Sequence, residues 1–442
     1  MKLVYNVQDR PSFGKTIVFA LQQLLAIMAA TIAVPAIVGN GMSPTAALFG
    51  AGVGTLVYQL FTKFRSPVFL GSSFAFLGSM FAAFAGAVSV EVGYLGLVLG
   101  ALFAGLVYCL ISLIVKIAGV KWIDKLMPPI VIGPTVSIIG LSLAGNAVSD
   151  LTAAPTGTAN PYICLIVGLV TLAVTMLCSV FGKKMVKMIP FIIGIAAGYV
   201  LAAILTAIGN ASGNEALQII NFGLFQNMTW VPDFTFLTAV KGFSEIDGNY
   251  IATIAVAYIP VAFVVFAEHL ADHKNLSTIV GTNLLEDPGL HRTLLGDGIG
   301  SFAGAIFGGC PNTTYGESIG CVAISGNASV ITIVVTAIMA IVISFFGPFA
   351  TFLATIPNCV MGGVCIALYG FIAVSGLKMF KELDLNDNRN LFVVSTILIT
   401  GIGGLSLTFG QVTITTIATA LILGILVNLM LGSKKKDDEE AK

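Results

Sequence analysis

Two short stretches of this 442-residue sequence place acidic side chains inside apolar runs. The stretch CPNTTYGESIG, residues 310–320, carries Glu317, and VVFAEHLADH, residues 264–273, carries Glu268 and Asp272. A charge near the middle of a bilayer costs about 2.5–3.5 kcal/mol even on lenient insertion scales, so such residues are rare and often functional. On a continuous helix Glu268 and Asp272 share one face. We therefore predict a site within the membrane that contains these three carboxylates.

Other polar residues near these acids allow plainer interpretations. Asp272 and His273 are also compatible with a solvated helix end, and this interpretation is favoured for His273. His269 follows Glu268 directly, so it points about 100° away around the helix. Asp297, in LLGDGIG, is either a polar partner within the membrane or a first-turn residue of its own helix.

Composition indicates that the chain lies in a membrane. Its residues are 57% hydrophobic and 10% charged, whereas soluble domains carry roughly 25% charged residues. Apolar runs of about 20 residues, long enough to span a bilayer, recur from end to end. The zero net charge gives no reason to expect a nucleic-acid partner, and the seven cysteines are interpreted as packing residues. We expect an all-α, polytopic membrane protein.

The basic residues predict fourteen transmembrane segments. With that number, and with both termini in the cytoplasm, 20 of the 21 Lys and Arg residues fall on the cytoplasmic side, which is the usual bias. The eighth segment is expected at 250–271, and the last two at 390–408 and 412–431.

One long polar stretch, residues 209–249, divides the chain and is expected outside the cell. It separates a first half, 1–208, from a second half, 250–433, and a charged cytoplasmic tail follows at 434–442. Because each half has seven segments, the second half must insert upside down relative to the first. The prediction is an inverted repeat, as in many transporters.

The third segment of each half is interrupted in the same way. SPVFLGSSFAF, residues 66–76, and CPNTTYGES, residues 310–318, each predict a short extended piece followed by a helix start. Such paired interruptions indicate the binding site of a transporter, although the small residues could simply ease the packing of two kinked helices. The expected helix N-caps are hydroxyl side chains: Ser72 or Ser73, and Thr313 or Thr314.

The predicted site suits a small neutral ligand. The backbone amides of Phe74 and Gly316, at the two helix starts, would donate hydrogen bonds into a shared cavity, and Glu268 and Glu317 would accept them. A nucleobase has matching N–H and C=O groups, whereas an anion would be repelled by the carboxylates. Burial also favours the protonated form of a carboxyl group, which suits Asp272 and Glu268 to carry a proton. No metal or other cofactor is expected.

Four motifs in order resemble the nucleobase–ascorbate transporter family, most closely its bacterial uracil permease branch. They are LGSSFAF, EH followed by an acid, DPGLHR at 287–292, and PNTTYGE. The resemblance implies fourteen segments in two inverted repeats, with a core domain of segments 1–4 and 8–11 and a gate domain of segments 5–7 and 12–14. It also implies uptake of uracil with a proton across the cell membrane, by a protein that forms homodimers.

The resemblance also implies which residues act. Substrate would contact the Phe74 amide, Glu268, Gly316 and Glu317, and Asp272 with Glu268 would couple the proton. Residues of a second tier would support the site: Gln23, Ser73, Asp297, Thr314 and Tyr315.

Three positions depart from the family pattern. The family's QH in the first span is QQ here, at 22–23; Asp272 stands where uracil permeases usually have His; and Ser318 replaces an Asn. Purine-transporting relatives tend to have Gln at the position of Glu317, so Glu favours uracil.

The predicted function is a proton-coupled nucleobase symporter, for uracil first and for a purine such as xanthine second, with sodium as the alternative coupling ion. A channel or an anion exchanger of the same fold is the weaker alternative. A membrane enzyme would need a nucleophile–base pair, for which His269 and His273 beside the acids are the one candidate, so no enzyme is expected.

Overall fold

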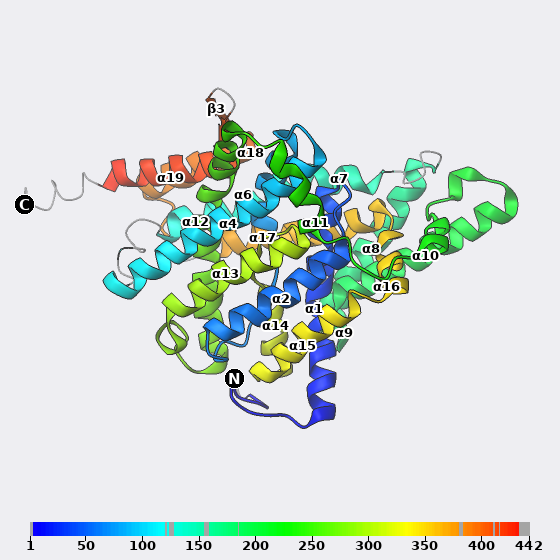
Figure 1. The fold of residues 1–442 in the computed structure, drawn as a ribbon, viewed down its shortest axis with the longest axis horizontal. Helices are drawn as coiled ribbons and strands as arrows, with labels where there is room; N and C mark the ends of the chain where they lie inside the picture. The colour runs from blue at the N-terminus through cyan, green and yellow to red at the C-terminus, as the bar shows by residue number, and fades with distance from the viewer. Residues whose placement is uncertain are drawn as a thin grey trace, which may run out of the picture.

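The structure is a computed structural model, and it describes residues 3–432 apart from 120–121, 123–127, 154–158, 184, 380–382, 410–411 and 415 (Figure 1). The predicted tail at 434–442 lies outside the described residues. The first half contains α1 (Phe13–Val38), α2 (Pro44–Phe61), β1 (Leu70–Ser72), η1 (Phe74–Phe76), α3 (Leu77–Ala85), α4 (Val90–Ala118), α6 (Pro129–Ser142), α7 (Ala144–Leu151), α8 (Pro161–Phe181), α9 (Met185–Met188) and α10 (Pro190–Ser212).

Short helices and a second set of long helices make up the rest. The stretch between the halves contains η2 (Glu215–Leu217), η3 (Phe222–Asn227), α11 (Thr235–Ala239) and η4 (Val240–Ser244). The second half contains α12 (Gly248–Val280), η5 (Leu285–Gly289), α13 (Leu290–Gly308), β2 (Asn312–Thr314), α14 (Gly316–Ser325), α15 (Val330–Ile343), α16 (Gly347–Ala354), α17 (Asn358–Lys378), α18 (Asn388–Ile402), β3 (Leu407–Phe409), β4 (Val412–Ile414) and α19 (Thr416–Gly432).

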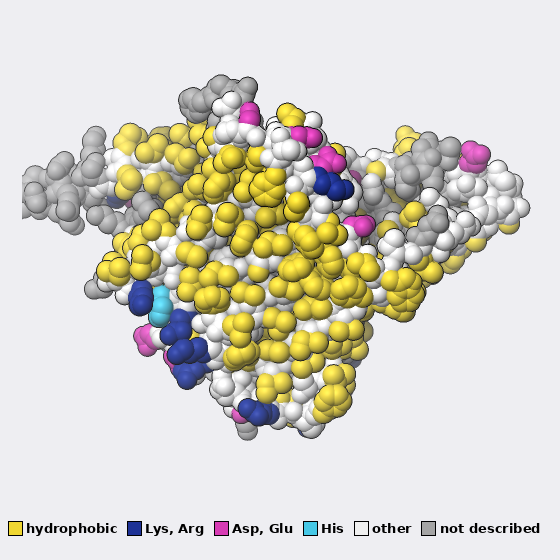
Figure 2. All heavy atoms as spheres, viewed as in Figure 1, with side chains coloured by type: hydrophobic (Ala, Val, Ile, Leu, Met, Phe, Trp, Pro, Cys, Tyr) yellow, Lys and Arg dark blue, Asp and Glu magenta, His cyan; other side chains and the backbone are white. Residues whose placement is uncertain are grey.

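The long helices are apolar enough to cross a membrane. Among the described residues, eight helices are long and apolar enough to span a bilayer, or nine if α15 and α16, bent by 83°, form one span. Shorter apolar helices cover 74–85, 388–402 and 416–432. The total of fourteen segments therefore stays a prediction. Figure 2 shows hydrophobic side chains over the middle of one face, with charged side chains gathered toward its upper and lower edges.

Three predicted segments differ from the observed elements. Helix α12 continues to Val280 instead of ending at residue 271, so Asp272 and His273 lie within the helix and not at its end. The hairpin β3–β4, in which Leu407 pairs with Ile414, occupies residues that were expected in the last two spans. In each strand Thr alternates with apolar residues, and no charged residue interrupts 407–414, so hydropathy alone does not distinguish this hairpin from a helix.

Small residues bring the helices close together. Helix α13 packs against α2 and α4, and α4 packs against α12. Where α13 crosses α2, a Cβ added at Gly50 would collide with the backbone oxygen of Gly304, and one added at Gly300 would lie 2.6 Å from the oxygen of Gly54. Close backbone approach through small residues is the usual way in which membrane helices pack. We call the elements α1–α4, β1, η1 and α12–α15 with β2 the first helix group.

A second helix group contains α6–α10 and α16–α19. In it α17 packs against α6, α7 and α8, α10 packs against α8, and α18 packs against α19 and α6. Gly376 of α17 lies against Gly133 and Ser137 of α6, where an added Cβ would collide with both. The candidate site lies where the two helix groups meet.

The two extended pieces pair with each other. Strands β1 and β2 are antiparallel, with Leu70 opposite Thr314 and Ser72 opposite Asn312. The Ser73 N–H extends the pairing by donating to the Pro311 oxygen over 2.9 Å. The pair satisfies backbone groups that lipid could not, and it places the starts of η1 and α14 beside one another.

Candidate functional site

A cavity of about 420 Å³ lies between the two helix groups. One wall comes from the first group and carries the residues that were predicted to bind substrate and proton: Phe74, Glu268, Asp272, Gly316 and Glu317. The facing wall comes from the second group and is mainly apolar: Ile132, Val136, Phe191, Leu368, Phe371 and Ile372. The cavity thus combines an acceptor-rich wall with an apolar one, which suits a flat ligand with polar edges.

Three elements position the polar wall. Helix α12 presents Glu268 and Asp272, one turn apart, on a single face. Helix α14 begins at Gly316, so Glu317 is in its first turn, where the helix dipole favours a carboxylate. Phe74 begins η1, and its ring packs edge-on against Tyr369 of α17 at 6.0 Å between centroids. The Phe74 ring therefore contacts the second helix group.

Of the predicted helix caps, only the position of Ser73 is confirmed. Ser73 occupies the N-cap position of η1, but its side chain makes no capping hydrogen bond, and Tyr315, not a threonine, precedes α14. Ser72 and Thr313 belong to the paired strands. The hydroxyl of Thr314 instead donates to Asp272 Oδ2 over 2.7 Å. The strand pairing holds these side chains away from the helix ends and ties β2 to the acidic face of α12.

Two residues of the predicted second tier brace the strands from behind. The Tyr315 hydroxyl donates to the Ser72 carbonyl over 2.8 Å. Gln23 Nε2 donates to the hydroxyl of Ser318, which accepts a second hydrogen bond from the Phe69 amide at 3.0 Å. Neither Gln23 nor Tyr315 is among the lining residues of the cavity. Both act on the position of the strands and of α14.

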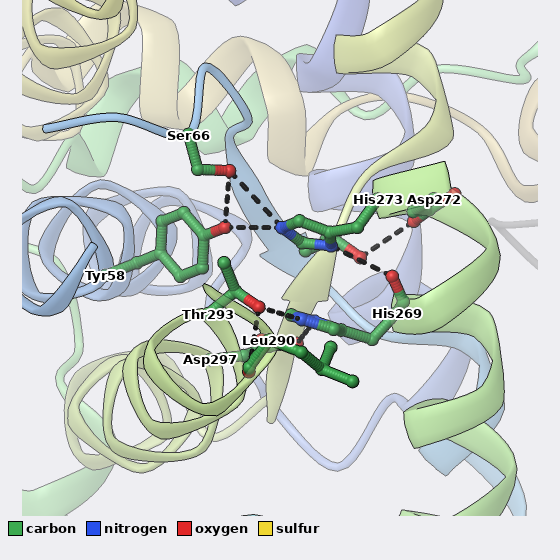
Figure 3. A network of polar contacts seen from close by, with 9 residues as sticks. Tyr58, Ser66, His269, Asp272, His273, Leu290, Thr293 and Asp297 are labelled. Carbon is green, nitrogen blue, oxygen red and sulfur yellow. Dashed lines mark hydrogen bonds and ion pairs between the residues drawn. The ribbon is translucent and has the colours of Figure 1, made fainter. Parts of the chain in front are cut away.

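A neighbouring face of α12, about 100° around the helix from the carboxylates, carries a buried network (Figure 3). His269 Nδ1 lies 2.7 Å from Asp297 Oδ2, and His269 Nε2 lies 2.9 Å from the Thr293 hydroxyl. His273 Nε2 lies 2.8 Å from the Tyr58 hydroxyl. Both histidine side chains are buried, and their rings stack with centroids 4.1 Å apart. We call these five residues the histidine network.

The histidine network distinguishes between the interpretations that the sequence allowed for His273 and for Asp297. The interpretation of His273 as a solvated helix end is wrong, because its ring is packed against α2 and bonded to Tyr58. Asp297 is a buried polar partner, seven residues into α13, and not a first-turn residue. It lies behind α12 and does not line the cavity.

Comparison with known sequences assigns the chain to a protein family. A family described as a permease family matches residues 14–410. The chain belongs to this family, the nucleobase–ascorbate transporters.

Three relatives within this transporter family match almost end to end. The uracil permease of Bacillus caldolyticus is 39% identical over 99% of this chain and 97% of its own length. That of Bacillus subtilis (strain 168) is 37% identical over 99% and 98%. That of Escherichia coli (strain K12) is 36% identical over 96% and 93%. The predicted resemblance is confirmed at the level of the family.

Solved structures are similar to this transporter in fold. The transmembrane domain of the cyanobacterial bicarbonate transporter BicA has a TM-score of 0.63 at 16% identity, over 96% of this chain and 99% of that one. The murine anion transporter Slc26a9, in its inward-facing state, has a TM-score of 0.66 at 11% identity, over 97% of this chain and 69% of that one. At these identities the likeness concerns the fold alone.

Sequence reasoning missed three contributors to the site of this transporter. Lys187, from α9, and Ser179, from α8, also line the cavity, and Tyr369 meets the Phe74 ring. From the sequence, Lys187 was expected only as a basic residue in a cytoplasmic loop, and no sequence pattern linked Tyr369 to Phe74. Within the described part of the chain, no group of three or more His, Cys, Asp or Glu side chains is placed to hold a metal ion.

Proposed function

We propose that this chain is a secondary active transporter that imports a nucleobase, uracil first, together with a proton. One observation carries the proposal: the residues expected to bind substrate, which come from both halves of the chain, line one cavity beside a paired-strand element. The names of the uracil permeases that match almost end to end point to the same substrate.

Recognition of uracil would use both kinds of polar group on the wall of the cavity. The carboxylates of Glu317 and Glu268 accept hydrogen bonds from ring N–H groups, and the amides of Phe74 and Gly316 donate to the carbonyl oxygens. Bonds to charged acceptors are the stronger kind. The apolar wall, with Phe371 and Leu368, packs against the faces of the ring.

Coupling to a proton would use Asp272. Two carboxyl groups on one helix face cannot both be ionised cheaply in a poorly solvated cavity, so Asp272 and Glu268 share a proton. Substrate N–H groups favour an ionised Glu268, which leaves the proton on Asp272. Thr314, bonded to Asp272, carries this change to β2 and to the neighbouring start of α14.

Alternating access would follow from movement of one helix group past the other. We propose that the first group corresponds to a core domain and the second to a gate domain, in fourteen segments built as two inverted repeats, 1–208 and 250–433. The protein would lie in the cell membrane as a homodimer, with both termini and the tail in the cytoplasm and 209–249 outside. The apolar interface across the cavity supports such sliding, because it holds few polar contacts to break.

Two alternatives remain as outcomes of a test. A purine permease would use the same cavity with a larger ring. An anion exchanger is suggested by the named substrates of the structural neighbours, and Lys187 supplies one cation, but three carboxylates on the opposite wall oppose an anion.

Uptake by proteoliposomes tests the proposal. Labelled uracil should accumulate when the outside is more acidic than the inside, and unlabelled uracil should compete better than xanthine, hypoxanthine or ascorbate. Stronger competition by xanthine would indicate the purine alternative. Uptake of bicarbonate without uracil would indicate the anion exchanger. Accumulation of uracil driven by a sodium gradient at equal pH would indicate that sodium, and not a proton, is the coupling ion.

A further inference from the structure

A second cavity lies between the same two helix groups. Its volume is about 280 Å³, and it is lined by Ile32 and Ala36 of α1, by Asp150 of α7, and by Asn358 and Met361 of α17. The first cavity is lined by Ala26 of α1 and Leu368 of α17. Ten residues separate Ala26 from Ala36, and ten separate Leu368 from Asn358, which is about 15 Å along each helix. The two cavities therefore lie on one line between α1 and α17.

An apolar cluster, which we call the barrier, lies between the linings of the two cavities. Met28 and Ile32 of α1 form a buried cluster with Leu353 of α16. Ile32 and Leu353 also form part of the lining of the second cavity. A ligand in the second cavity therefore rests against the barrier that separates it from the carboxylates of the first.

A close helix contact builds the polar wall of the second cavity. Gly362 of α17 lies so close to α7 that an added Cβ would be 3.0 Å from the backbone carbon of Asp150. Asn358 precedes Gly362 by four residues, so it lies on the same face of α17. Asp150, which is half-buried, and Asn358, which is exposed, thus both belong to the wall that the second helix group gives to this cavity.

The two cavities have opposite arrangements. In the first, the carboxylates stand on the first helix group and the apolar wall on the second. In the second, Asp150 and Asn358 stand on the second group, and α1 supplies an apolar wall of Ile32, Ala36 and Ile37. Each cavity offers carboxylate acceptors and amide donors to the edge of a flat ring, and an apolar surface to its face.

We propose that the second cavity is a transit site for the same nucleobase, on the far side of the barrier from the main site. Asp150 accepts a ring N–H, Asn358 bonds a ring carbonyl, and the apolar wall of α1 covers the ring. The second helix group would hold the ligand there until the barrier opens and the first group takes it over. This inference rests on the proposed function for its ligand.

Protection of a cysteine reporter tests the transit site. Ala36→Cys places a thiol in the second cavity, where Ala36 is exposed, and a charged thiol reagent labels it in purified protein. The parent protein, with its seven cysteines, gives the background. Uracil at about four times its dissociation constant for the second cavity should slow labelling about fivefold, because only the unoccupied fraction of the protein reacts. Ile37→Cys is the second reporter, and a cavity in which neither thiol reacts would overturn the proposal.

Two substitutions, each combined with the cysteine reporter, distinguish binding at the transit site from binding at the main site. In Glu317→Gln, which weakens the main site, uracil should still protect the reporter, whereas in Asp150→Asn protection should be lost. Glu215→Gln, an exposed acid away from both cavities, is the matched control and should retain protection. Protection that disappears with Glu317→Gln and persists in Asp150→Asn would assign it to the main site. A parent that takes up uracil without any protection overturns the transit site alone, and absence of uptake overturns the proposed function.

Discussion

Two faces of α12 carry ionisable side chains that differ in burial and in hydrogen bonding. On one face Glu268 and Asp272 line the cavity, and both residues are half-buried. On the other face His269 and His273 are buried, and each ring nitrogen lies within hydrogen-bond distance of a partner. The sequence repeats an acid followed by histidine every four residues, so one helix turn separates equivalent positions on each face.

This difference shows which polar groups remain available to form hydrogen bonds with a ligand. A buried polar group must be bonded within the protein, because leaving it unpaired is costly. The two histidine rings meet that need through Tyr58, Thr293 and Asp297 and through the His269 carbonyl, and these bonds hold the rotation of α12 about its axis. The carboxylate face keeps acceptors open. We therefore expect changes on the histidine face to lower stability, and changes on the carboxylate face to lower binding or coupling.

The largest effect is expected for His269→Ala. It removes the partner of Asp297, which is buried and has a second oxygen, Oδ1, without a hydrogen-bond partner in the structure. Breaking a buried pair in this way costs about 3–5 kcal/mol. Thermal unfolding in detergent should show the loss. His269→Asn, which keeps a donor near Nδ1, should recover part of the stability, and an unfolding temperature like that of the parent for Ala would show that the network is not structural.

Glu317→Gln should lower uracil affinity without changing stability. It keeps the size of the side chain and removes the charged acceptor, which costs about 1.5–3 kcal/mol, or roughly 10- to 150-fold in affinity. Binding to purified protein and thermal unfolding measure the two effects separately. Glu286→Gln, an exposed acid of η5, is the control. Unchanged affinity in Glu317→Gln would move the substrate site elsewhere.

Asp272→Asn should uncouple transport from the proton. The amide fixes the position in a neutral state, so substrate binding and exchange should persist while accumulation driven by a pH gradient is lost. One pH unit can drive about a tenfold accumulation, or 1.4 kcal/mol, when one proton moves with each substrate. Accumulation in proteoliposomes is measured beside counterflow at equal pH. Accumulation like that of the parent would assign coupling to Glu268 instead.

The smallest effect is expected for Phe74→Leu. The proposed contact with substrate is the amide, which the substitution keeps. The lost ring pair with Tyr369 is worth about 0.5–1.5 kcal/mol and acts on packing between the helix groups. Affinity should therefore stay within about threefold of the parent. Abolished binding in a well-folded Leu variant would make the ring the contact, whereas Phe74→Pro, which deletes the amide, should bind no substrate.

Local properties of the chain determined its class and much of its site. Hydropathy and the scarcity of charges show a helical membrane protein, because the cost of burying charge in lipid acts on each segment by itself. The acids at 268, 272 and 317 stand out for the same reason. The matched interruptions at 66–76 and 310–318 predicted both extended pieces, since prolines, glycines and hydroxyl residues disfavour a continuous helix.

Only the tertiary structure decided how these pieces meet. Pairing of β1 with β2 joins residues at least 240 positions apart and diverts Thr314 from a helix cap to Asp272. The burial of His273 depends on Tyr58, far away in α2, and no local pattern shows that contact. A hydrogen-bond partner or an open cavity is settled by which helices pack side by side, and that packing depends on the shapes of all the helices together.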